Sequence, residues 1–103
     1  MSPVLESKIG QLAGLCPKRH VRRLALFGSA VEDRFNPDTS DLDLLVEFQP
    51  MPPAEHADNY FGFQEDLQRL FGFSVDLVEP GSIRNPYFRQ AVEQTQLLLY
   101  EAA

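Results

Sequence analysis

Apolar residues recur along the chain in two rhythms, one typical of helices and one typical of strands. Leu5, Ile9, Leu12 and Cys16 follow helical spacing, which predicts an amphipathic helix over residues 3–16 that ends before Pro17. A second helical face is predicted over residues 54–71, with Gly72 as its C-cap. A third helix is predicted over residues 86–94.

The apolar runs between these helices are predicted to be strands, over residues 22–28, 42–48, 73–79 and 96–101, the last being a short strand or a docked tail. Residues 29–34 could form a short helix, and residues 36–41 have the composition of a loop. The run Leu44-Leu45-Val46 is apolar on both faces of its strand, which indicates a central position. The order of elements predicts an α/β (α+β) fold, a mixed β-sheet packed by helices.

Length and composition limit the classes of protein that the chain can be. At 103 residues, with 44% hydrophobic residues, we expect one folded domain over residues 1–103. No apolar run is long enough to span a bilayer, and the first residues lack the apolar core of a signal peptide. The lone Cys16 cannot form an intrachain disulfide. We therefore expect a cytoplasmic protein without a membrane partner.

The net charge of −6 is unevenly distributed along the chain. Residues 1–36 hold six Lys or Arg and three acids, whereas residues 37–103 hold three Lys or Arg and twelve acids. This balance argues against stable binding of nucleic acid. The one basic cluster, KRHVRR over residues 18–23, is either a solvated turn before a strand or a contact with nucleotide phosphate or a partner protein.

Two carboxylates interrupt an otherwise apolar strand. Asp41 and Asp43 are two residues apart, so both project to one face, while Leu42 and Leu44 point into the core. Carboxylates this close resist ionising together unless a cation lies between them. Oxygen ligands of this kind suit Mg²⁺. Asp76, a single charge in the strand FSVDLVE, could face the same pocket if its strand pairs beside the second one.

Gly28 and Ser29 make this acidic pattern more specific. A glycine that ends a strand, followed by a serine, offers backbone N–H groups and a hydroxyl to phosphate oxygens. Alone the pair is an ordinary strand terminator. Together with D-x-D on one strand and an aspartate on another, it indicates metal-assisted phosphoryl chemistry.

With these motifs, LFGS, SDLDLLVEF and VDLVEPGSIRNPYFR, the chain resembles the minimal nucleotidyltransferases (MNT) of the polymerase-β-like nucleotidyltransferase superfamily. The likeness covers residues 20–101 and is to the antitoxin half of HEPN–MNT toxin–antitoxin pairs. The resemblance implies that Gly28 and Ser29 contact the nucleotide triphosphate. It also implies that Asp41, Asp43 and Asp76 hold two Mg²⁺ ions, with Asp76 nearest the attacking hydroxyl.

The sequence departs from the family pattern just after Ser29. Eleven residues, rather than about ten, separate Ser29 from Asp41, and Ala-Val-Glu-Asp stands where many relatives carry an arginine. Arg34 could supply the missing positive charge at the nucleotide.

The resemblance implies transfer of AMP from ATP to a hydroxyl, a tyrosine of the HEPN toxin, which is an RNase that this modification silences. The predicted ligands are thus Mg²⁺ and ATP, and the predicted partner is a small helical HEPN-type toxin. The alternative is a non-catalytic antitoxin that neutralises the toxin by forming a complex with it.

Overall fold

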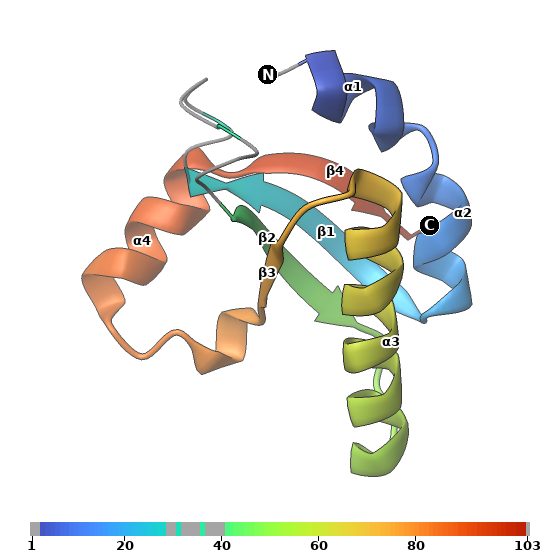
Figure 1. Ribbon diagram of the computed structural model, residues 1–103. Helices are drawn as coiled ribbons and strands as arrows, with labels where there is room; N and C mark the ends of the chain where they lie inside the picture. The colour runs from blue at the N-terminus through green and yellow to red at the C-terminus, as the bar shows by residue number, and fades with distance from the viewer. Residues whose placement is uncertain (1–2, 29–30, 32–35, 37–40, 103) are drawn as a thin grey trace.

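A four-stranded sheet organises the chain, and helices lie on both of its faces (Figure 1). The structure, a computed structural model, describes residues 3–28, 31, 36 and 41–102. The helices are α1 (Pro3–Ile9), α2 (Leu12–Lys18), α3 (Pro53–Phe71) and α4 (Pro86–Thr95), with a 3₁₀ turn, η2 (Pro80–Ser82), before α4. The strands are β1 (Val21–Phe27), β2 (Leu42–Phe48), β3 (Val75–Val78) and β4 (Leu97–Glu101).

The strands lie in the order β3-β2-β1-β4. β1 pairs antiparallel with both β2 and β4, whereas β2 pairs parallel with β3. The α3 helix provides the long connection that a parallel pair requires. The prediction of a mixed sheet packed by helices is confirmed, as are the internal position of β2 and the identity of residues 97–101 as a strand.

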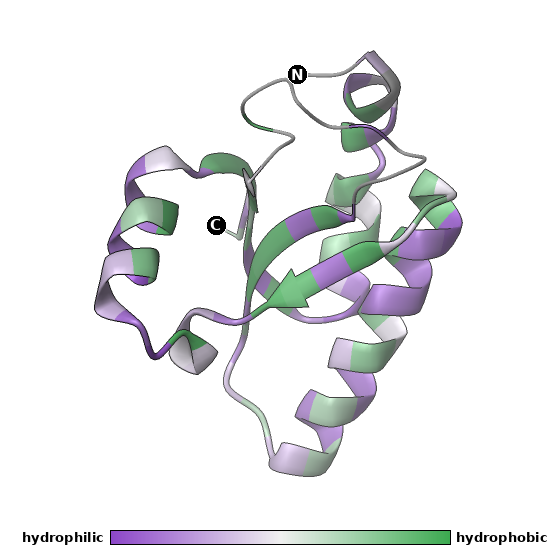
Figure 2. Cartoon of the chain, turned by 60° about the vertical axis from the view of Figure 1, so that its left-hand side comes forward, coloured by the Kyte–Doolittle hydropathy of each residue, from purple (hydrophilic) through white to green (hydrophobic). Residues whose placement is uncertain are grey.

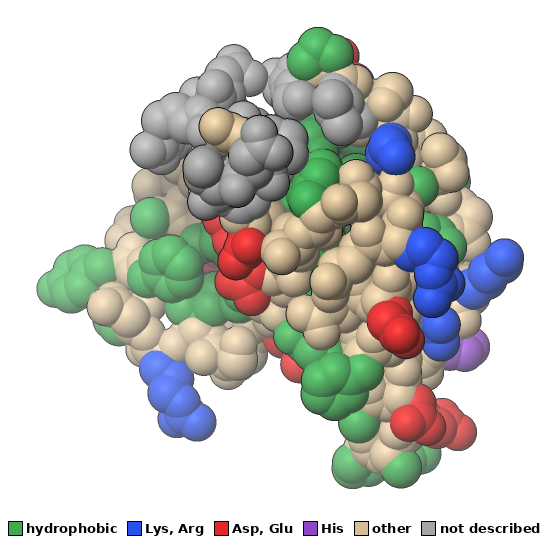
Figure 3. Space-filling view, viewed as in Figure 1, with side chains coloured by type: hydrophobic (Ala, Val, Ile, Leu, Met, Phe, Trp, Pro, Cys, Tyr) green, Lys and Arg blue, Asp and Glu red, His purple; other side chains and the backbone are tan. Residues whose placement is uncertain are grey.

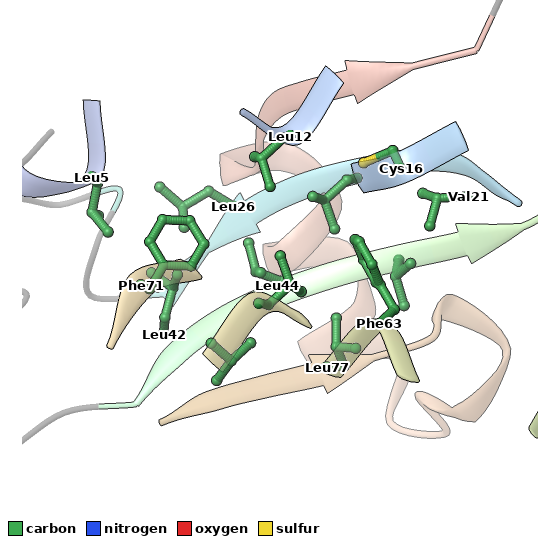
Figure 4. Close-up of a cluster of buried hydrophobic side chains, with 14 of the residues drawn as sticks. Leu5, Leu12, Cys16, Val21, Leu26, Leu42, Leu44, Phe63, Phe71 and Leu77 are labelled. Atoms are coloured by element: carbon green, nitrogen blue, oxygen red, sulfur yellow. The ribbon is translucent and has the colours of Figure 1, made fainter. Parts of the chain in front are cut away.

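The larger core lies between the sheet and α1, α2 and α3. Alternate residues of the strands meet apolar residues of these helices there, and Figure 4 shows their side chains converging. Its fully buried members include Leu5, Leu12, Leu24, Leu44 and Phe63. Burial of this apolar surface is the main force that holds the helical layer on the sheet.

A smaller apolar cluster lies on the opposite face, between the sheet and α4. It contains Ala25, Phe27, Leu45 and Val92, with Val78 and Ile83 packed against it. Figure 2 shows the hydrophobic side of α4 turned towards the strands. Because α4 is the one helix on this face within the described residues, polar strand residues there remain open to solvent or to a ligand.

The prediction of one continuous helix over residues 3–16 is wrong. The chain turns at Gly10 and Gln11, which separate α1 from α2. Leu5 and Leu12 are nevertheless buried in the same cluster. Two short helices therefore satisfy the apolar spacing as well as one long helix does.

The predicted helix end before Pro17 is also wrong, because α2 includes Pro17 and ends at Lys18. The N–H groups of Arg19 and His20 close the last turn on the carbonyls of Cys16 and Pro17, at 3.2 Å each. The predicted short helix over residues 29–34 falls almost wholly outside the described residues. No helix among the described residues is both long and apolar enough to cross a membrane.

Candidate functional site

The two strand aspartates lie side by side in the sheet. Asp43 of β2 and Asp76 of β3 are direct partners in the parallel register. Their neighbours in sequence point to the other face and are buried in the larger core: Leu42, Leu44, Val75 and Leu77. Asp43 and Asp76 therefore share the α4 face of the sheet, as strand alternation requires. Asp76 is exposed, whereas Asp43 is partly buried.

Asp41 lies directly before β2 and is exposed. Burial raises the pKa of the Asp43 carboxyl, and the negative charges of Asp76 and Asp41 raise it further. Asp76 and Asp41 are thus both close enough to Asp43 to act on its carboxyl group electrostatically. In Figure 3, acidic side chains gather beside the hydrophobic side chains over α4.

Gly28, which follows β1, lies against the carboxylate of Asp43. Phe27 and Asp43 are register partners of β1 and β2, so the chain leaves β1 at the level of the acidic pair. A Cβ added to Gly28 would lie 2.5 Å from Oδ2 of Asp43, and the φ of Gly28 is +76°. Only glycine tolerates both conditions. Ser29 and Arg34, the other predicted nucleotide contacts, lie outside the described residues.

The described residues fit a magnesium site formed by two carboxylates, Asp43 and Asp76, rather than one formed by three. Among the described residues, no group of three or more His, Cys, Asp or Glu side chains is placed to hold a metal ion. Mg²⁺ commonly takes one or two carboxylates and completes its shell with water and substrate phosphates. The repulsion at Asp43 is the kind of unfavourable charge interaction that such a cation relieves.

One aromatic residue of α4 contacts Phe27, the register partner of Asp43. Phe88 packs edge-on against Phe27, with ring centroids 6.3 Å apart. Asn85 caps the helix, because its side-chain oxygen accepts hydrogen bonds from the N–H groups of Tyr87 and Phe88. Phe88 therefore holds α4 against the sheet. Tyr87 does not, because it is 83% exposed.

Two polar side chains of α3, Tyr60 and Gln64, contact the backbone of β3. The Tyr60 hydroxyl donates a 2.6 Å hydrogen bond to the carbonyl of Leu77, and the Gln64 amide donates a 3.3 Å bond to the carbonyl of Val75. Both acceptors flank Asp76. Burial raises the pKa of Tyr60, and the charges of Asp76 and Glu79 raise it further, so its hydroxyl remains a donor. In the sequence, these two residues can be seen only as polar side chains one helical turn apart on α3.

The basic cluster KRHVRR does not meet the acidic pair. Arg22 bonds to Glu47 at 2.9 Å, and Arg23 lies 3.4 Å from Glu101. Both arginines belong to the start of β1, at the opposite end of the strand from Gly28. Their ion pairs with Glu47 and Glu101 argue against a contact of these two arginines with nucleotide phosphate.

Known proteins resemble this chain in sequence and in fold. The sequence profile described as "Nucleotidyltransferase domain" matches residues 9–98. A Methanocaldococcus jannaschii protein named "Putative protein adenylyltransferase MJ0128" is 36% identical over 77 residues, which cover 75% of this chain and 74% of that protein.

Solved structures share the fold. A "putative minimal nucleotidyltransferase" superposes with a TM-score of 0.75 at 26% identity, covering 90% of both chains. A chain in a complex described as tri-AMPylated Shewanella oneidensis HEPN toxin with MNT antitoxin gives a TM-score of 0.62 at 17% identity. That match covers 94% of this chain and 72% of the other.

Proposed function

The chain belongs to the nucleotidyltransferase domain family, and on this premise we propose that it transfers AMP from Mg²⁺–ATP to a tyrosine hydroxyl of a HEPN-type toxin. The transfer would silence the toxin, and the chain would act as the antitoxin. The observation that carries the proposal is the pairing of Asp43 with Asp76 beside the turn at Gly28.

Each described group has a distinct part in this proposal. Asp43 and Asp76 would hold the metal, with Asp41 adding negative charge beside them. The absence of a side chain at Gly28 leaves its backbone free to approach the triphosphate. Bound Mg²⁺ would neutralise phosphate charge and polarise the α-phosphate. Asp76 belongs to an edge strand and is exposed, so an acceptor hydroxyl can approach from its side.

The reaction needs no covalent intermediate on the protein. The acceptor oxygen forms a bond to the α-phosphorus, the bond between that phosphorus and the oxygen leading to the β-phosphate breaks, and pyrophosphate leaves. The acceptor proton passes to solvent. The protein contributes positioning and charge neutralisation. The AMPylated HEPN toxin found with a chain of the same fold supports AMP as the transferred group and a toxin as the acceptor.

A binding-only antitoxin is the second candidate. The observation that favours it is that no three His, Cys, Asp or Glu side chains among the described residues are placed to hold a metal ion. In this case the chain would neutralise the toxin by covering it, without ATP.

Mass spectrometry of the toxin after incubation with this chain, ATP and Mg²⁺ distinguishes the two. Catalysis predicts a gain of one adenylyl group for each transfer, with release of pyrophosphate. Asp43→Asn and Asp76→Asn should each slow transfer about 100-fold or more, because charge stabilisation of the transition state is lost. Asp58→Asn, on the exposed side of α3, is the matched control. Neutralisation without any mass gain, unaffected by both site substitutions, would establish the binding-only function.

A further inference from the structure

The strand that carries Asp76 is short and lies at an edge of the sheet. β3 has four residues, and among the described strands it pairs with β2 alone. An edge strand has a row of backbone groups without a partner strand and is held less firmly than an internal strand. A metal site that depends on Asp76 therefore needs an additional means of holding β3 in place.

Backbone alternation shows which carbonyls of β3 point away from β2. The carbonyl of Ser74 accepts a 3.0 Å bond from the N–H of Leu42, so it points towards β2. Successive carbonyls of a strand point to opposite sides, so those of Val75 and Leu77 point to the open edge. These two carbonyls accept the bonds from Gln64 and Tyr60.

The geometry of helix and strand explains why one pair of side chains serves both carbonyls. Residues four apart on a helix are about 6 Å apart along its axis. Residues two apart on a strand are about 6.6 Å apart. Tyr60 and Gln64 therefore match the spacing of Leu77 and Val75, with α3 running antiparallel to β3.

The ring of Tyr60 is itself held by its neighbours. It packs against Phe61 and Phe48, with centroid separations of 5.2 and 6.4 Å. The hydroxyl is therefore directed at the edge of β3 by a packed ring rather than by a mobile side chain.

We infer that Tyr60 and Gln64 are positioning residues that hold Asp76 at the level of Asp43 by bonding the carbonyls on either side of it. Neither residue touches substrate; both act through the backbone of β3. The inference rests on the proposed function for its catalytic meaning. Its structural content, a fixed Asp76 that binds metal with Asp43, can be measured without ATP or a partner.

The test uses the full chain and its variants Tyr60→Phe and Gln64→Met, which remove the donors with little change in volume. Mn²⁺ binding, measured by electron paramagnetic resonance, should weaken about 3- to 10-fold in each, at or below the lower end of the loss seen when supporting hydrogen bonds of metal ligands are removed. Amide hydrogen exchange in β3 should accelerate. Tyr100→Phe, on the opposite edge strand β4, is the control and should change neither quantity.

A double variant separates positioning from a general loss of stability. In an Asp76→Asn background, Tyr60→Phe should not weaken Mn²⁺ binding further, because the group that it positions has gone. In the transfer assay, Tyr60→Phe should raise the Mg²⁺ concentration needed for half-maximal rate and leave the KM for the nucleotide unchanged.

Equal Mn²⁺ affinity in the wild-type chain and both single variants, or no Mn²⁺ binding by the wild-type chain, would overturn the inference. Weakened Mn²⁺ binding in the variants of a chain that transfers no AMP would support it while rejecting the proposed function.

Discussion

Asp43 shows how a single residue can oppose the stability of the fold that carries it. Folding places its carboxylate in a partly buried strand position beside Asp76 and Asp41, and these surroundings raise its pKa. The unfolded chain imposes no such environment. Ionised Asp43 therefore destabilises the folded, metal-free protein at neutral pH.

We predict that Asp43→Asn makes the metal-free protein more stable at neutral pH. Because the pKa of Asp43 is higher in the folded than in the unfolded state, its unfavourable contribution is complete above the folded pKa, shrinks as pH falls below that value, and is absent below the unfolded pKa. The gain should be below about 1 kcal/mol, since water screens a partly exposed carboxylate. Thermal unfolding from neutral to mildly acidic pH should show the two proteins converging. A less stable Asp43→Asn variant would contradict this account, and Asp58→Asn should behave as wild type.

Gly28→Ala should destabilise the protein more than Gly72→Ala does. Both glycines have positive φ, at +76° and +82°, but a Cβ at Gly72 meets nothing within 4 Å, whereas one at Gly28 meets Asp43. Gly72→Ala should therefore lose only the conformational cost, about 1–2 kcal/mol. Urea unfolding measures the difference, which an added Asp43→Ala substitution should remove. Equal losses of stability at both positions would mean that the Asp43 side chain moves away from the added Cβ at no cost in free energy.

At the residue scale, strand alternation alone was enough to predict which face of the sheet most of the site residues occupy. Placing Asp41 and Asp43 on one face and Leu42 and Leu44 on the other requires only that residues 42–48 form a strand. The contact between Gly28 and Asp43 could not be predicted, because it depends on the register that pairs Phe27 with Asp43.

At the scale of elements, a side-chain pair joins α2 to α3. Nε of Arg19 donates to Oδ2 of Asp66 at 2.7 Å, and the Asp66 side chain is only 14% exposed. A Cβ at Gly62 would collide with the Arg19 guanidinium, so α3 has a glycine where the arginine crosses it. The α2 helix follows a turn and contains Pro17. The bond between Arg19 and Asp66 fixes its C-terminal end against α3.

Arg19→Met and Asp66→Asn should each lower the free energy of unfolding by about 1 kcal/mol, because each removes a charge-assisted hydrogen bond. The double variant should lose less than the sum, since the two residues share that bond. Chemical denaturation measures the cycle. Arg22→Met is the matched control: its pair with Glu47 has a half-exposed arginine and should contribute little. A strictly additive cycle would show that Arg19 and Asp66 do not depend on each other.

Helix continuity is where sequence reasoning failed at this scale. Apolar spacing reports which side of a helix is buried, and α1 and α2 bury the same side in one cluster. A change of direction at Gly10 leaves that spacing intact. The roles of Tyr60 and Gln64 could not be predicted from the sequence either. Their hydrogen bonds go to backbone carbonyls, which every residue has, so the identity of the partner residue gives no indication of the contact.

For the whole molecule, the predicted ligand should act as a stabiliser. Mg²⁺–ATP at about 100 times its dissociation constant should raise the free energy of unfolding by about 2.7 kcal/mol, provided that it binds only the folded chain. Thermal shift measures this effect. ATP with a chelator should give little stabilisation, because the triphosphate and a protein of net charge −6 repel each other. A shift that persists in an Asp43→Asn, Asp76→Asn double variant would place the nucleotide elsewhere.

The strand order follows only partly from the sequence. An internal β2 is predictable because Leu44, Leu45 and Val46 are apolar on both faces. The pairing of β4 with β1 is not, because Leu97 and Leu98 remain 41% and 48% exposed and their apolar run shows no alternation. Long-range pairing of this kind is decided by the assembled sheet.

The same strand order has a consequence for synthesis on the ribosome. β2, α3 and β3 are consecutive in the chain, so the segment that brings Asp43 beside Asp76 is complete as soon as β3 has emerged. β1, made earlier, obtains its second neighbour only when β4 emerges. Since folding during translation proceeds from the N-terminus, the acidic pair can assemble in the nascent chain while one edge of β1 is still open.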